Sequence, residues 1–533
     1  MERLTESNKL KDQREMIKIM KQHSFASRLK SLALVFGIAL AFASCANEDI
    51  AQNPNGTDNN KNFTIFSTGD PATRTSMESN GAFYWEAGDK IWVKDDNGTW
   101  QQSRNAPTEK TASFKFEVPG KFTKTTTYKV YYPGQNGNQN QVTIAANQSQ
   151  AKPNTTTHFG TSGDCGMADA AWSNAKNGFA FTLDHKAAYL LFLPRTSNTV
   201  LHDCYLTKVE VNSDNDITST YTLNPTTGTL TGTGSGKQIV VATVGSGTYA
   251  NGFPLTNNAT SAATNGAYVV IKPGTHTLKV RYWVKDVVTH VEGTITKILA
   301  SATYDQNKYY NITANLDVRD YDGDHYYMWD AKEQYWKGYE WTKHLPSGTG
   351  QPTFIDGIGS SNYAQTNSDL RYYHEGSGAV QATQSCATLP NANEMIWYVR
   401  SGDPRWDADE LWTTMGHLHK GGMWLKKKAY ISGFNANTAF GHDWRTYINS
   451  VGWYPSSTPP EVANANNYFY LPAMGYYREG SMLLLGSEAY YWSSTANPLS
   501  RKDAYYLTFT SSYIGVSPNY VDRYYGCRVG TFE

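Results

Sequence analysis

The chain has 533 residues and no net charge, because its 47 acidic side chains balance its 47 basic ones. Without a basic excess, nucleic acid is not an expected partner. Aromatic residues make up 14% of the chain, including 37 Tyr, while charged residues make up only 18%. Because Tyr and Thr suit half-buried pleated surfaces, this composition is typical of β-rich extracellular proteins with several domains.

The N-terminus has the three parts of a secretory signal. Arg28 and Lys30 precede a short apolar run at 32–43, and the sequence FASC follows at 42–45. The run is shorter than the roughly 20 residues that cross a bilayer as a helix. Residues 42–45 resemble the lipobox of bacterial lipoproteins, which implies cleavage before Cys45 and a lipid on its thiol. An ordinary signal peptide with a chance cysteine is the alternative.

Two more features of this region bear on localisation. Met20 is the more natural start of a signal peptide, so we interpret 1–44 as the signal peptide and 1–19 as a mis-called start. The acidic cluster at 46–49 resembles the export tag of Bacteroidota lipoproteins. It implies a protein that is anchored by lipid in the cell outer membrane and exposed at the surface. The Asn-rich segment 45–61 predicts a flexible lipidated tether.

Residues 62–318 have the pattern of successive strands. Asn97 and Gly98 predict a tight hairpin. The apolar positions 278, 280, 282 and 284 alternate with polar or amphipathic ones, which predicts a strand with one buried face. Such runs are separated by Gly, Pro and Asn turns, and this favours β-sandwiches over βαβ units.

Several ordered segments of this region resemble Mfa-like fimbrillins of Bacteroidota. They are ATRT at 72–75, FYWEAGDKI at 83–91, FTLDHKAA at 181–188 and YYNIT at 309–313. The resemblance implies two transthyretin-like β-sandwich subdomains, at 62–195 and 196–318. It also implies that other fimbrial subunits are partners through strand exchange, a form of β-augmentation. Arg74 is the candidate protease cleavage site of polymerising members, and an ordinary strand arginine is the alternative.

The remaining residues, 319–533, predict a mixed domain. Asn391 and Glu394 form a capping-box pair, so a helix is expected to start there. The acidic run at 407–410 predicts a second short helix. The last residues return to strand patterns, at 490–495, 504–509 and 526–529.

Three segments of this domain resemble the Fibrobacter succinogenes major paralogous domain, which is related to the C-type-lectin-like fold. They are LPAMG at 471–475, YWSST at 491–495 and GCRV at 526–529, the last with Arg and Val swapped. The resemblance implies an α+β C-type-lectin-like recognition domain at 319–533. The predicted fold class is therefore mainly β, with two sandwiches followed by this domain.

Four cysteines remain beside Cys45, and outside the cytoplasm they are expected to pair. The simplest of the three connectivities joins Cys165 to Cys204 and Cys386 to Cys527. The resemblance to the C-type-lectin-like fold also implies the second of these disulfides.

No motif predicts catalysis or a metal site. The acidic segment 320–324 fails the EF-hand pattern, so a solvated linker is favoured; no cofactor is expected, although calcium is not excluded. His417 and His419 have no third ligand, and we interpret them as solvated loop residues. The Gly-x-Ser-x-Gly frame is absent around Ser493. We therefore expect no enzyme.

Aromatic residues between the predicted helix and residue 471 are the candidate ligand-binding residues, because this region forms long loops in the fold that the domain resembles. The candidates are Trp406, Trp412, Trp424, Trp453 and Tyr454. Burial in the core is the alternative for each, and Trp492 is assigned to the core.

These patterns favour an adhesin or fimbrial subunit, at a pilus tip, that binds a glycan or a host or bacterial protein through its C-terminal domain. The second hypothesis is a surface glycan-binding lipoprotein that never polymerises and serves nutrient capture. A formylglycine-synthase-like enzyme is the third.

Overall fold

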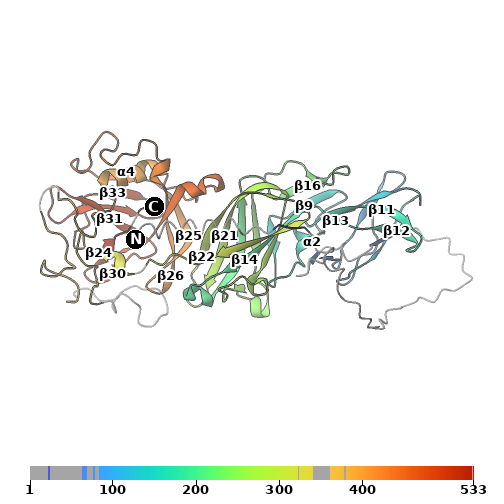
Figure 1. Cartoon of the computed structure of the whole chain (residues 1–533), viewed down its shortest axis with the longest axis horizontal. Helices are drawn as coiled ribbons and strands as arrows, with labels where there is room; N and C mark the ends of the chain where they lie inside the picture. The colour runs from blue at the N-terminus through green and yellow to red at the C-terminus, as the bar shows by residue number, and fades with distance from the viewer. Residues whose placement is uncertain are drawn as a thin grey trace, which may run out of the picture.

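The computed structural model describes residues 22–24, 63–68, 76–77, 83–321, 323–339, 361–376, 380–530 and 532. These residues form an elongated molecule built mainly of β-strands (Figure 1). The mainly β class predicted from the sequence is confirmed. Cys45, the tether and Arg74 lie outside the described residues. In the described part of the chain, no helix has the length and apolar character needed to cross a membrane.

The first β module surrounds a core rich in aromatic rings. Tyr128, Val130 and Tyr132 pack around Phe66 and Trp85, whereas Tyr131 is buried in the core of the second module. The predicted hairpin at 97–98 joins two strands at the edge of this sheet. The strands follow the order β6 (Trp100–Gln102), β5 (Trp92–Lys94), β8 (Tyr128–Tyr132), β11 (Gly166–Ser173), β12 (Gly178–Phe181), β2 (Thr64–Thr68) and β7 (Lys115–Val118), and β13 (Asp184–His185) pairs with β11.

The second module packs two sheets around the largest core. One sheet has the order β1 (Gln22–Ser24), β23 (Lys308–Asn315), β14 (Ala188–Arg195) and β20 (Ala267–Ile271). The other begins with β10 (Asn147–Ser149), β18 (Gln238–Ala242), β15 (Cys204–Ser213), β21 (Gly274–Asp286) and β22 (Glu292–Tyr304), with β19 (Phe253–Pro254) beside β15. A smaller sheet contains β17 (Leu230–Thr231), β16 (Ser219–Leu223) and β9 (Gln141–Ile144). Because β9, β10 and β14 pair within this module, the chain enters it before residue 196.

Strand β21 shows how the second module meets the third. Its residues at 278, 280, 282 and 284 are fully buried, which confirms the predicted alternation. Its other face carries Lys279, Arg281 and Trp283. The C-terminal module covers part of that face, where the Lys279 ammonium group donates to the Pro460 carbonyl at 2.8 Å. The sheet also continues from β22 into this module through Thr294, which pairs with Glu410. The added strands are β25 (Arg405–Thr414), β26 (His417–Lys426) and β28 (Tyr468–Pro472).

The C-terminal module has a second sheet and one helix of ten residues, α4 (Ala392–Ser401). The helix contacts the sheet mainly at its last two strands, and Trp492 is fully buried in the core, as predicted. The sheet has the order β24 (Tyr326–Tyr327), β34 (Cys527–Arg528), β31 (Ala489–Ala496), β32 (Ala504–Phe509), β33 (Ile514–Ser517) and β27 (Val451–Trp453). Shorter elements include the pairs β3 (Ser76–Met77) with β4 (Phe83–Tyr84) and β29 (Tyr476–Arg478) with β30 (Ser481–Leu483), the helices α2 (Phe159–Ser162) and α3 (Ala262–Asn265), and the 3-10 turns η1 (Thr199–Asp203), η2 (Gly247–Tyr249), η3 (Gly323–His325), η5 (Lys428–Tyr430) and η6 (Val462–Asn467).

Helix α4 begins where the sequence predicts. The Glu394 N–H donates to the Asn391 side chain, and the Asn391 N–H donates to the Glu394 carboxylate at 2.9 Å. The second predicted helix is wrong, because residues 407–410 lie in β25. Met415 and Gly416, with φ of 52° and 76°, form a two-residue turn that pairs β25 with β26. Pairing with β26 across this turn overrides the local acidic pattern.

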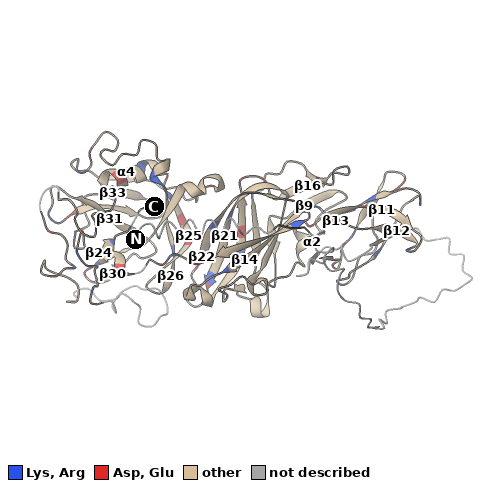
Figure 2. Ribbon diagram, in the orientation of Figure 1, with Lys and Arg blue, Asp and Glu red and all other residues tan. Residues whose placement is uncertain are grey.

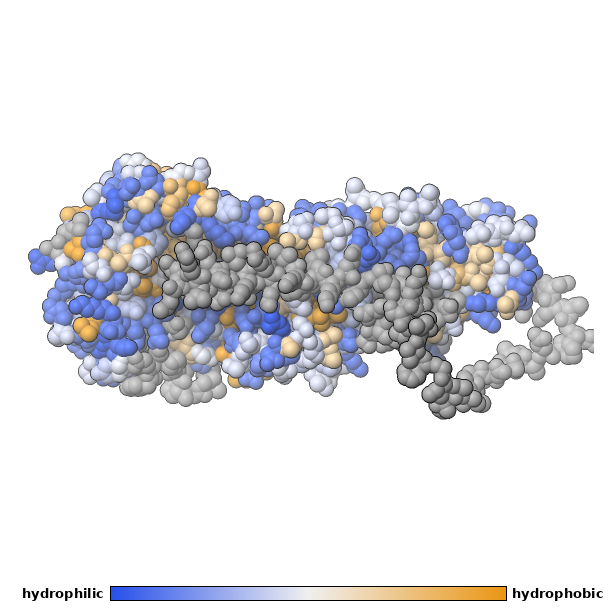
Figure 3. Space-filling model, in the orientation of Figure 1, coloured by the Kyte–Doolittle hydropathy of each residue, from blue (hydrophilic) through white to orange (hydrophobic). Residues whose placement is uncertain are grey.

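Charged residues of both signs are spread over the described part of the chain, as Figure 2 shows. Figure 3 shows hydrophobic residues in small, separate groups on this face. A candidate binding surface is therefore better sought in local side-chain geometry than in the overall field.

Candidate functional site

The five aromatic residues predicted to bind a ligand lie in three different environments. Trp412 is only 1% exposed and belongs to the core. Trp406 and Trp424 are half-buried on β25 and β26. Trp453 is 44% exposed and Tyr454 81%. Two of the five candidates thus lie on open surface, next to each other at the end of the edge strand β27, and a ligand-binding role for them stays a prediction.

Trp453 belongs to a surface on which an arginine lies between aromatic rings. The guanidinium carbon of Arg400 is 4.7 Å from the ring centroid of Trp453 and 5.5 Å from that of Phe440. The Phe440 ring is 4.7 Å from the Trp397 ring. Arg400 and Trp397 share one face of α4 because they are three residues apart. We define the aromatic platform as Trp397, Arg400, Phe440, Trp453, Tyr454 and Tyr513.

Tyr513 extends the platform across the paired strands β27 and β33. Its ring covers Gly452 and Gly515, which pair in register. A Cβ atom at Gly452 would lie 2.6 Å from a ring carbon of Tyr513, and one at Gly515 would meet its hydroxyl. The absence of side chains at both glycines therefore lets the ring lie against the sheet. Burial and the nearby Tyr454 raise the pKa of Tyr513, so its hydroxyl stays protonated at neutral pH.

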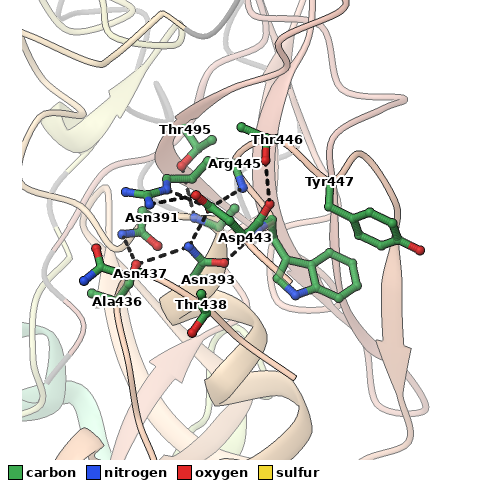
Figure 4. A network of polar contacts seen from close by, with 12 residues as sticks. Asn391, Asn393, Ala436, Asn437, Thr438, Asp443, Arg445, Thr446, Tyr447 and Thr495 are labelled. Atoms are coloured by element: carbon green, nitrogen blue, oxygen red, sulfur yellow. Dashed lines mark hydrogen bonds and ion pairs between the residues drawn. The ribbon is translucent and has the colours of Figure 1, made fainter. Parts of the chain in front are cut away.

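A polar network holds the loop that carries Phe440 against the start of α4 (Figure 4). The Asn393 amide donates to the Asp443 carboxylate at 3.0 Å, and its carbonyl oxygen accepts the Trp444 N–H at 2.8 Å. Arg445 donates to both carboxylate oxygens of Asp443 at 2.8 Å. Hydrogen bonds from Arg445 and Asn393 lower the pKa of Asp443 to about 2. Since these contacts are internal to the protein, they preset the position of the loop before any ligand binds.

The indole of Trp397 adds a second attachment of the same loop. Its N–H donates to the backbone carbonyls of Asn435 and Thr438, at 3.1 and 3.0 Å. The Asn391 side chain donates to the Ala436 carbonyl at 2.9 Å. Asn391, which caps α4, and Trp397, which belongs to the platform, therefore both hold this loop in place.

Sequence reasoning missed four members of the platform, Trp397, Arg400, Phe440 and Tyr513. Arg400 could have been found from its spacing to Trp397 within the predicted helix. Phe440 is a large apolar residue in a segment rich in Asn, Thr and Gly, and Tyr513 follows two serines between strand patterns. Both are the kind of isolated aromatic residue that a loop exposes.

The structure corrects the interpretation of His417 and His419. Both are 5% exposed and lie in β26, which pairs with β25 along one edge and with β28 along the other. The His419 ring stacks on Trp412 at 4.9 Å. Burial, with a smaller effect of His417, lowers the pKa of His419 to about 3. These residues belong to the core rather than to a solvated loop.

The acidic segment 320–324 is only partly described, since residue 322 lies outside the described residues. The Asp320 carboxylate accepts the Thr413 hydroxyl at 3.0 Å, which ties this segment to β25. Over the described residues, no group of three or more His, Cys, Asp or Glu side chains could hold a metal ion.

The predicted disulfides are not present. Cys165, Cys204, Cys386 and Cys527 are all buried free thiols. Each occupies a hydrophobic core, as a small apolar side chain does, and Cys386 and Cys527 share one cluster. The Cys386 sulfur accepts the Asp330 N–H at 3.2 Å. Burial raises the pKa of all four thiols, so they are protonated and unreactive.

No protein-family model matches the chain, and no curated protein matches it either. Among solved structures, a candidate cell adhesion protein from Bacteroides ovatus is 15% identical, with 48% of this chain and 93% of that chain covered and a TM-score of 0.30. One from Bacteroides uniformis is 18% identical over 49% and 94%, with a TM-score of 0.27. The fimbrial anchor protein Mfa2 from Porphyromonas gingivalis is 12% identical over 44% and 82%, with a TM-score of 0.21. TM-scores of this size do not establish a shared fold.

Proposed function

We propose that the chain is a surface adhesin of the fimbrillin type that binds its ligand on the aromatic platform. The observation that carries the proposal is the arrangement of Arg400 between the exposed rings of Phe440 and Trp453. Tryptophan and arginine are the residues that most often dominate binding surfaces, because they combine large contact area with directed donors. The network around Asp443 supports the proposal, since a preset loop loses little entropy on binding.

A glycan is the ligand that the platform suits best. Ring faces at Phe440 and Trp453 complement the apolar face of a sugar ring. The Arg400 guanidinium and the Tyr513 hydroxyl supply donors for its oxygen atoms. A protein ligand would use the same rings as anchors, and it is the other outcome of the binding experiment.

The experiment presents the purified protein to a glycan array and to host matrix proteins. For the ligand found, Trp453→Ala and Arg400→Ala should each weaken binding by about tenfold or more, as residues at the centre of a binding surface do. Tyr520→Ala is the control, since Tyr520 is 87% exposed in the same module and lies outside the platform. Equal losses in all three variants, or wild-type binding by Trp453→Ala, would contradict the proposal.

Partnership with other fimbrial subunits is the second part of the proposal, and β23 is the strand that we assign to it. Among the described residues, one side of β23 pairs with β14, while the other pairs with β1 at Lys308–Tyr310 alone. The strand β1 belongs to the predicted signal peptide. Its removal would leave the outer edge of β23 open to a strand from another subunit.

Mass spectrometry of surface material separates this role from the alternative. Cleavage after Arg74 with loss of the lipidated N-terminus, in high-molecular-weight material, is the expected result for a fimbrial subunit. A monomer that keeps lipid on Cys45 would instead support the stationary glycan-binding lipoprotein. The enzyme hypothesis requires reactive cysteines, and burial of the four described thiols argues against it.

A further inference from the structure

A cavity of about 170 Å³ lies where the C-terminal module meets the outer face of β21 and β22. Lys279 and Arg281 of β21 form part of its floor. Its walls come from the C-terminal module and include Trp424 of β26, Tyr468 of β28 and residues between 459 and 466. The turn η6 packs against both β21 and β22. The cavity therefore exists because the two modules meet, and neither module forms it alone.

Positive charge predominates in this cavity. Three lining side chains are cationic, Lys279, Arg281 and Lys427, and only Asp407 is anionic. Asp407 is already engaged, because it accepts hydrogen bonds from Arg281 at 2.9 Å and from the Trp424 indole at 3.2 Å. The Arg281 Nε is buried and has no acceptor among the described residues. The cavity thus holds more positive charge than its own acidic side chain balances.

The two lysines of the cavity donate hydrogen bonds to neutral groups rather than to carboxylates. Each ammonium group donates to a neutral backbone carbonyl, Lys279 to Pro460 and Lys427 to Asn466, both at 2.8 Å. Burial and then the nearby Arg281 lower the pKa of Lys279, although three surrounding carboxylates act in the opposite direction. A bound anion would offset both effects, because it would give the buried cations a charged partner.

We propose that this cavity binds the carboxylated sugar ring at the end of an acidic glycan. Lys279 and Lys427 would meet the carboxylate, and Trp424 and Tyr468 would line the ring. The volume of about 170 Å³ is below the roughly 300–1,000 Å³ of pockets that hold drug-sized ligands, which favours a single sugar ring over a longer chain. Uronic and sialic acids share this chemistry. No residue of the cavity belongs to the aromatic platform, so the inference stands apart from the proposed function.

The test is isothermal titration of the purified protein with galacturonate and, separately, with galactose. These sugars differ only in the carboxylate at carbon 6. Galacturonate should bind about tenfold more tightly or better, the factor that a charge-assisted hydrogen bond can supply. N-Acetylneuraminate as a third ligand distinguishes sialic from uronic acids. Equal affinity for galacturonate and galactose, or no binding of any acidic sugar at millimolar concentration, would overturn the proposal.

Variants then locate the site. Lys427→Gln removes one ammonium group from a half-buried lining residue and should reduce the affinity for the acidic sugar by about tenfold. Lys428→Gln is the matched control, because Lys428 is exposed and is not a lining residue. It should bind as the wild type does. Wild-type affinity in Lys427→Gln, with an unchanged melting temperature, would refute the site.

Discussion

Glu410 links the C-terminal module to the second module through three hydrogen bonds. Its carboxylate accepts the Thr296 N–H at 3.1 Å, the Thr296 hydroxyl at 2.7 Å and the Thr294 hydroxyl at 3.1 Å. Desolvation, followed by the charge of Asp407, raises the pKa of Glu410 from its ordinary 4.5 to about 7. We therefore predict that the fold becomes less stable as the pH rises through neutrality, and that Glu410→Gln removes this dependence.

The magnitude follows from proton linkage. A raised pKa means that the folded protein holds the proton more tightly than the unfolded chain does. The stabilisation is complete below the unfolded pKa and is lost as the pH rises through the folded one. At 1.36 kcal/mol per unit, a shift from 4.5 to about 7 corresponds to about 3 kcal/mol. Glu410 also lines a cavity of about 320 Å³ at the junction. Water there screens the charge, so about 1–3 kcal/mol is the expected loss.

Urea unfolding of the wild type and of Glu410→Gln, at pH values from about 5 to about 8, measures this difference in the free energy of unfolding. Relative to the variant, the wild type should lose stability across this range. Glu461→Gln is the control, because Glu461 is an exposed carboxylate that directly precedes η6. Parallel pH curves for the wild type and Glu410→Gln would show that Glu410 does not titrate at the junction, and the reasoning would fail.

Three further predictions concern the C-terminal module. Trp412→Ala should lower the free energy of unfolding by about 3–5 kcal/mol, and Trp453→Ala by less than about 1 kcal/mol, since only the first side chain is buried; similar losses in urea unfolding would contradict this. Gly452→Ala should displace the Tyr513 ring and weaken binding on the platform, which a crystal structure and the binding assay would check. Asp443→Asn should speed amide hydrogen exchange in its loop. In the wild type the loop should stay protected until the pH falls towards about 2, because the lowered pKa keeps Asp443 ionised; unchanged exchange in the variant would contradict the role of the network.

The strands of the first two modules could be predicted because their signal is local. Tyr128, Val130 and Tyr132 occupy every second position of their strand, and all three are buried in the core of the first module. A capping box is also local, and Asn391 starts α4 as expected. Residues 407–410 carry a local acidic pattern as well, but the partners that make them a strand lie in β26 and β22. Pairing between distant segments is not visible in such a short window.

The candidate site could be predicted only in part for a related reason. The high tryptophan content indicates which region contains the candidate site. It does not distinguish Trp412, which is buried in the core, from Trp453, which is exposed at the end of an edge strand. Arg400 and Phe440 come from different segments, and they meet because Asn393 and Asp443 hold the loop against α4. Such a surface depends on tertiary contacts, which composition does not encode.

The junction determines what the platform can do in an adhesin. Arg281 and Asp407 form an ion pair at 2.9 Å, with both side chains largely buried. A buried ion pair contributes little net stability because desolvation offsets its Coulomb energy, but it strongly disfavours arrangements that separate the charges. Together with the pairing of Thr294 and Glu410, it fixes the C-terminal module in one orientation on the sandwich. If the second sandwich is part of a fibre, load on the platform passes to it through these contacts and not through a flexible linker alone. The mechanical strength of attachment would then depend on the same residues that line the junction cavities.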